Sequence, residues 1–183
     1  YQNTKSVFTI HNLKFQGKWE INAIKTMTGL SDEYFTPETM EAYGDSNFLK
    51  GGVVFADAVT TVSETYAEEI KTAFFGEGLD GLLRARSNDL SGIVNGIDYD
   101  EYNPETDPFI ANNYNAENFR KEKIKNKKEL QKELGLEQDE KKFMIGLVSR
   151  LTDQKGLDLI NCVMDEICDE DVQLVVVGTG TEK

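Results

Sequence analysis

Short apolar runs alternate with stretches of helical periodicity along this chain. Each run is rich in β-branched or aromatic residues and is bounded by polar or glycine-containing turns, as are strands buried on both faces of a parallel sheet. The pattern predicts an α/β fold with mainly parallel sheets. The expected strands are Ser6–Ile10, Ala58–Val62, Ser91–Val94, Phe143–Val148 and Gln173–Val177.

Three stretches between these runs have the spacing of helices. Ser63 can cap a helix whose apolar stripe reaches Phe74. A second helix is expected over Lys155–Cys168, with one apolar face packed against a sheet. The stretch Glu117–Glu133 interleaves bases with acids and predicts a solvated surface helix that stops at Gly135, although a basic anion-binding patch is the alternative.

A connecting segment is predicted after the third strand. Residues 95–108 concentrate Asn, Gly and Asp and hold two of the three prolines, a composition typical of a connection. We therefore divide the chain into residues 1–94 and residues 95–183. The first residue is Tyr1 rather than Met, and the last apolar strand stops almost as soon as it turns, so both ends are expected to be cut.

Composition and charge narrow the classes of function. The chain has 20 Lys and Arg against 33 Asp and Glu, a net charge of −13, which would repel nucleic acids and anionic membranes. It contains no run of about 18 apolar residues and no signal-peptide pattern. A cytoplasmic protein without nucleic-acid or membrane partners is therefore expected. Cys162 and Cys168 match no metal or redox spacing and are expected to be buried apolar residues.

The most informative stretch is VSRLTDQKG at residues 148–156, between an apolar strand and a predicted helix. Arg150 and Lys155 would lie at a helix N-terminus, where the macrodipole disfavours cations by about 0.3 kcal/mol or more. A bound anion would explain this placement, because backbone N–H groups converge on phosphates at such edges. A guanidinium and an ammonium together suit a diphosphate. The alternative is a surface pair that answers Asp153 and Asp158.

The second candidate is TIHNLKFQG at residues 9–17, which carries the one histidine of the chain at the end of a strand. His11, Asn12 and Gln16 can offer an imidazole and two amides to a polar ligand. A histidine that is merely hydrogen-bonded within the protein is an equal alternative.

Further candidates follow two other predicted strands. Asn95, in the segment GIVNGI, reaches the same kind of edge, although Asn-Gly commonly serves only as a turn. Gly178 and Gly180 follow the last strand and suggest a ligand-binding loop. The segment GEGLDG at residues 76–81 follows a helix and lacks the GxGxxG order, so we reject a dinucleotide fingerprint.

Five segments resemble the glycogen and starch synthase family and occur in the family's order. The family's pattern contains HNL-x-x-QG, FLK-x-G, TVS-x-x-YA, NGID and VSRL-x-x-QKG. These stand here as His11–Gly17, Phe48–Gly51, Thr61–Ala67, Asn95–Asp98 and Val148–Gly156. The resemblance implies the GT-B fold, two Rossmann-like lobes that face each other across a cleft. Residues 1–94 would then be the second half of the N-terminal lobe, and residues 95–183 a linker and the first half of the nucleotide-sugar-binding lobe.

The resemblance also implies roles for single residues. Arg150 and Lys155 would bind the donor pyrophosphate and stabilise charge as ADP leaves, with no metal and no cofactor required. His11 would lie beside the glucosyl ring with Asn12 as support, and Asn95 would lie near the bound sugar. The remaining predicted substrate-binding residues are Gln16, Gly178 and Gly180.

The activity implied is transfer of glucose from ADP-glucose to the non-reducing end of an α-1,4-glucan acceptor, with retention of configuration. The family's KTGGL and EPCGL segments are missing, so the chain alone is expected to be an inactive internal fragment of this hexosyltransferase. One alternative is a non-catalytic α/β module with a degenerate sugar-nucleotide cleft, against which the presence of Arg150, Lys155 and His11 argues. The other is a related retaining glucosyltransferase that uses UDP-glucose.

Overall fold

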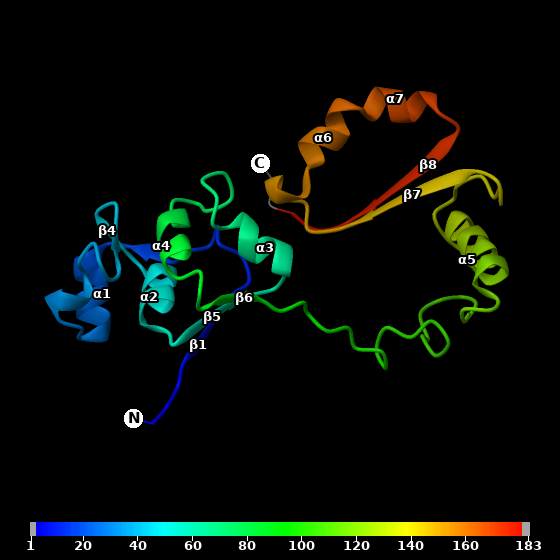
Figure 1. Ribbon diagram of the computed structural model, residues 1–183. Coiled ribbons are helices and arrows are strands. Elements are labelled where there is room, and N and C mark those ends of the chain that lie inside the picture. The colour runs from blue at the N-terminus through cyan, green and yellow to red at the C-terminus, as the bar shows by residue number, and fades with distance from the viewer. Residues whose placement is uncertain (1–2, 181–183) are drawn as a thin grey trace. The chain divides into compact units, whose positions relative to one another are not determined.

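The computed structural model describes residues 3–180 and divides the chain into two compact units. The first unit extends to Ile97 and the second begins at Asp98 (Figure 1). The assignment of residues 1–94 and 95–183 to halves of two larger lobes stays a prediction. No helix within residues 3–180 is long and apolar enough to cross a membrane.

A three-stranded parallel sheet forms the centre of the first unit. Its strands are β1 (Val7–Ile10), β5 (Ala58–Thr61) and β6 (Leu90–Gly92), in the order β1-β5-β6. The register places Ile10 beside Thr61 and Thr61 beside Gly92, so the three strands end at one level. The first two predicted strands and the parallel arrangement are confirmed. The third strand, predicted over Ser91–Val94, runs instead over Leu90–Gly92, and Ile93 and Val94 lie exposed beyond it.

Helices α1 (Ile21–Thr28), α2 (Phe48–Phe55), α3 (Glu64–Glu69) and α4 (Asp80–Ala85) and the 3₁₀ turn η1 (Asp32–Tyr34) complete this unit. The Ser63 hydroxyl accepts a hydrogen bond from the backbone N–H of Tyr66 at 3.3 Å, which confirms the predicted cap. The predicted stripe of this helix is wrong at its end. The helix ends at Glu69, and Ile70 and Phe74 lie in the turns that follow it. Phe74 is 85% exposed.

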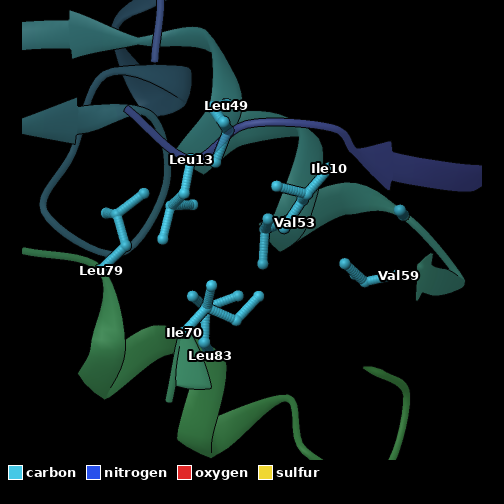
Figure 2. Packing of buried hydrophobic residues seen from close by; sticks show 9 residues of the cluster. Ile10, Leu13, Leu49, Val53, Val59, Ile70, Leu79 and Leu83 are labelled. Carbon is cyan, nitrogen blue, oxygen red and sulfur yellow. The ribbon is translucent and has the colours of Figure 1, made fainter. Parts of the chain in front are cut away.

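The core of the first unit lies between the parallel sheet and its helices (Figure 2). Ile10 and Val59 come from β1 and β5, and Val53 comes from α2. Each is at most 1% exposed, so each contributes roughly 1.5–3 kcal/mol of hydrophobic free energy. Leu13 belongs to the same cluster, and it anchors the loop that follows β1.

A second, antiparallel sheet was not expected from the sequence. Strands β2 (Lys18–Trp19), β4 (Asp45–Asn47) and β3 (Glu41–Ala42) pair in the order β2-β4-β3. None is longer than three residues, so no alternation of apolar and polar positions can develop. The turn between β3 and β4 contains Tyr43 and Gly44, both with positive φ.

The second unit contains a two-stranded parallel sheet of β7 (Phe143–Val148) and β8 (Val172–Val177). Helix α5 (Phe119–Glu133) precedes it. The 3₁₀ turn η2 (Asp153–Lys155), α6 (Leu157–Cys162) and α7 (Met164–Asp169) connect the two strands. The predicted strands and the surface helix are confirmed, and Gly135 ends that helix with φ +68°.

Three expectations for the second unit are wrong. The helix predicted over Lys155–Cys168 begins only at Leu157 and is broken at Val163, because Asn161, Cys162 and Val163 are consecutive poor helix formers. Both cysteines are exposed, because no neighbouring element among the described residues covers that side of the helices. The strands are not buried on both faces, since Val148 is 83% exposed and Val176 is 47% exposed.

Candidate functional site

The carboxyl edge of the first sheet gathers two of the predicted site residues. His11 directly follows Ile10 at the end of β1, and Asn95 lies three residues beyond Gly92 at the end of β6. With β5 between them, the two strands are about 10 Å apart, or two strand spacings. Polar groups at this edge of a parallel sheet are where α/β proteins bind ligands.

His11 is exposed and lines a cavity of about 450 Å³ together with Asn12 and Gln16. The Asn12 side-chain oxygen accepts a hydrogen bond from the Lys14 N–H at 3.0 Å, and the Asn12 carbonyl accepts one from the Phe15 N–H. Asn12 therefore shapes the loop after β1 in addition to lining the cavity. The imidazole remains accessible for a ligand.

Residues of the TVS-x-x-YA segment hold this loop in place. The Thr61 hydroxyl donates a buried hydrogen bond of 2.8 Å to the carbonyl of Ile10, the residue before His11. The Leu13 N–H donates to the Tyr66 hydroxyl oxygen at 3.2 Å. Two segments about fifty residues apart in the chain thus fix the backbone on both sides of the histidine.

Gln16 is also part of this loop, but its side-chain amide faces the interior. The residue as a whole is 5% exposed. Its oxygen accepts from the Asn47 amide at 2.7 Å, and its nitrogen donates to the Glu77 carbonyl at 2.9 Å. The Asn47 oxygen in turn caps α2 by accepting from the Lys50 N–H. This geometry favours a supporting role for Gln16, and its contact with a sugar stays a prediction.

Asn47 supports the loop of the candidate site, and the sequence pattern did not predict this role. It is fully buried, and it connects Gln16 to the start of α2. Its position immediately before an apolar helical stretch is a recognisable cap signal. Sequence alone could have found the cap but not the bond to Gln16, which joins residues 31 positions apart.

The carboxyl edge of the second sheet gathers Arg150, Gly178 and Gly180. Arg150 lies two residues beyond the end of β7, and Gly178 directly follows β8. The Leu151 N–H donates to the Thr179 carbonyl at 2.8 Å, and Leu151 also forms a bridge with Gly180. The two loops therefore run side by side, with their backbones paired beyond the strands.

Gly178 permits this close pairing. A Cβ atom at Gly178 would overlap the carbonyl oxygen of Ser149, and one at Gly180 would lie 2.6 Å from the carbonyl oxygen of Leu151. Any larger residue at Gly178 would push the loop that carries Arg150 away. The close approach of the two backbones thus explains why glycine stands at both positions. A direct contact of either glycine with a ligand stays a prediction.

Arg150 and Lys155 are both exposed, and neither forms an ion pair with a carboxylate of residues 3–180. The alternative of a surface pair with Asp153 or Asp158 is not realised in that part of the chain. Lys155 ends a 3₁₀ turn, and Gly156, with φ +67°, separates it from α6. The dipole of the helix that follows is therefore weaker than expected, because α6 has only six residues. Two accessible cations remain in the connection that follows β7, where they can bind a polyanion.

Asp98 of the NGID segment has a local role in the second unit. Its carboxylate accepts hydrogen bonds from the N–H groups of Glu101 and Asp100, at 3.0 and 2.9 Å. These two bonds hold the pKa of Asp98 below its usual value, because they stabilise the ionised form. Asp98 thus shapes the turn that starts the second unit.

Polar loops at the carboxyl edges of two separate parallel sheets are typical of α/β proteins that bind nucleotides and sugars. The chain matches the structure of the catalytic domain of starch synthase IV from Arabidopsis thaliana bound to ADP and acarbose. The TM-score is 0.90 and the identity 34%, over 99% of this chain and 37% of that one. The fold is therefore α/β of the GT-B type.

Sequence comparison identifies the family. Residues 1–85 match the family described as the starch synthase catalytic domain. The chain is 72% identical over all 183 residues to the glycogen synthase of Lachnospira eligens, and 52% identical over 180 residues to that of Bacillus cereus. It spans 38% of the length of each. The chain belongs to the glycogen and starch synthase family, as its five ordered segments predicted.

Proposed function

We propose that this chain forms part of a glycogen synthase, a hexosyltransferase that acts in glycogen biosynthesis. The enzyme would transfer glucose from ADP-glucose to the non-reducing end of an α-1,4-glucan, with retention of configuration. The observation that carries the proposal is 72% identity to a glycogen synthase over the whole chain. Because the chain spans 38% of that relative, the activity is assigned to the full-length protein. A cytoplasmic location belongs to the same proposal.

Arg150 and Lys155 would bind the pyrophosphate of the donor. Both are exposed in the connection after β7 without a carboxylate partner in residues 3–180, so an anion would not have to displace an ion pair there. Gly178 and Gly180 would keep the neighbouring loop close to them. The ADP bound to the plant starch synthase supports ADP-glucose over UDP-glucose.

His11 would line the side of the site that holds the glucosyl unit, with Asn12 shaping its loop and Asn95 at the same sheet edge. The accessible imidazole beside a cavity of about 450 Å³ supports this assignment. Gln16 would support the loop from beneath through Asn47. The acceptor glucan would approach the glucosyl unit from this side.

The reaction would follow a front-face route. The bond between the glucosyl anomeric carbon and the β-phosphate oxygen breaks, while an acceptor hydroxyl forms its bond on the same face of the sugar. The departing phosphate takes the proton of that hydroxyl. Arg150 and Lys155 would stabilise the charge that develops on the phosphate, without any protein nucleophile.

The test is a transfer assay with the purified full-length protein and glycogen. ADP-glucose and UDP-glucose are supplied in parallel, and the incorporated glucose is released by an enzyme specific for α-1,4 linkages. We expect incorporation from ADP-glucose at a rate well above that from UDP-glucose. Transfer mainly from UDP-glucose would correct the donor, whereas no transfer from either donor would favour the non-catalytic module.

A further inference from the structure

Two largely exposed aromatic side chains lie in and just beyond the loop of residues 11–17 that follows β1 and carries His11, the histidine loop. Phe15 is 65% exposed and Trp19 is 61% exposed. Between His11 and Trp19, Leu13 is fully buried and Gln16 is 5% exposed, so the loop has well-buried anchors of its own. Burial therefore does not explain why the loop carries large aromatic rings at its exposed positions.

The backbone under both rings is held firmly. The carbonyls of Gln16 and Gly17 accept hydrogen bonds from the N–H groups of Leu49 and Phe48, at 3.0 and 3.2 Å. Trp19 pairs with Ser46 in the antiparallel sheet, and the Ser46 hydroxyl donates to the Trp19 carbonyl at 2.8 Å. A ligand that binds these rings would meet a preformed backbone, which reduces the entropy lost on binding.

The two rings also belong to adjoining hollows. Phe15 lines the cavity of about 450 Å³ that contains His11, and it lines a second hollow of about 370 Å³ that contains Trp19. Gln16 and Gly17 are common to both hollows. A continuous surface thus leads from His11 across Phe15 to Trp19, all within the first unit.

We propose that this surface, defined by Phe15 and Trp19, binds the acceptor as a linear α-glucan, with successive glucosyl units on the two rings. Sugar rings present apolar C–H faces that pack on aromatic faces, while their hydroxyls need donors such as the neighbouring Lys14 and Lys18. The inference rests on the proposed function, since it places the chain end at His11. It adds acceptor-binding residues that make the enzyme prefer long acceptors.

The experiment compares KM for maltoheptaose between the full-length wild-type enzyme and its variants Phe15→Ala and Trp19→Ala. We expect each substitution to raise KM for maltoheptaose about tenfold, in line with the loss of one stacking contact. KM for ADP-glucose and kcat at saturating acceptor should stay within twofold of wild type. Trp19→Phe should recover most of the affinity. Phe74→Ala is the matched control, because Phe74 is an exposed aromatic in the same unit that lines neither hollow.

Two results would overturn the inference. One is an unchanged KM for maltoheptaose in both alanine variants at an unchanged melting temperature. The other is a melting temperature lowered by several degrees with unchanged KM, which would mean that another part of the full-length protein covers the rings.

A second readout separates this inference from the proposed function. The fluorescence difference between wild type and Trp19→Phe isolates the signal of Trp19, and it is titrated with maltoheptaose. Binding without any glucose transfer would refute the proposed function and keep the glucan surface. Glucose transfer with no change in Trp19 fluorescence, and with an unchanged KM for maltoheptaose in the alanine variants, would keep the proposed function and refute the glucan surface.

Discussion

Replacing Gln16 by Met tests whether this residue supports the histidine loop or binds sugar. Met has a similar length and no branch, so it fills the same space without the amide. The substitution removes the 2.7 Å bond from Asn47 and the 2.9 Å bond to the Glu77 carbonyl. Gln16 is 5% exposed and Asn47 is fully buried, so water cannot replace the first bond without a rearrangement.

The size of the effect follows from what is left without a partner. The buried Asn47 amide loses its acceptor, which costs about 1–3 kcal/mol. The Glu77 carbonyl belongs to an exposed residue and can be hydrated, so its share is about 1 kcal/mol or less. The expected loss in the free energy of unfolding is therefore about 1–4 kcal/mol. Full-length Gln16→Met should also lose turnover, because His11 is held by the same loop.

Urea unfolding of the 183-residue protein measures this loss. Trp19 is the one tryptophan of the chain and lies three residues from Gln16, so its fluorescence reports on the first unit. With a slope of about 2 kcal/mol per molar urea, the midpoint should fall by about 0.5–2 M. Gln138→Met, at an exposed glutamine, is the control and should leave the midpoint unchanged. A Gln16→Met variant of wild-type stability and reduced activity would refute the supporting role and favour sugar binding.

Three further outcomes are expected. Arg150→Ala or Lys155→Ala in the full-length enzyme should cost about 2–4 kcal/mol of transition-state stabilisation, mainly in turnover; a kcat/KM within a factor of three of wild type would remove the pyrophosphate assignment. His11→Ala should lower turnover but leave the melting temperature nearly unchanged, because His11 is exposed; a large loss of stability with full activity would point to a structural histidine. The isolated 183-residue chain should neither extend glucan nor bind ADP-glucose with micromolar affinity (about −8 kcal/mol) in calorimetric titration; either result would make it a self-sufficient catalytic unit.

The sequence alone determined the features that depend on near neighbours in the chain. The strands Phe143–Val148 and Ala58–Val62 were readable because several consecutive apolar, largely β-branched residues have few other structures available. The Ser63 cap and the Gly135 stop were readable because each acts within one helical turn. The five family segments followed from the order of residues, and they identified the family without any coordinates.

Tertiary structure decided the features that depend on residues far apart in the sequence. The sequence pattern marked Gln16 as polar and available, but Asn47 and Glu77, which are 31 and 61 positions away, occupy its amide. Cys162 lies in an apolar helical pattern, yet it is exposed because burial depends on what packs against a helix rather than on its periodicity. The roles of Gly178 and of the Thr61 hydroxyl also became visible only when separate strand ends lay side by side. Local propensity therefore specified the elements, and long-range packing specified which polar groups remain free to bind a ligand.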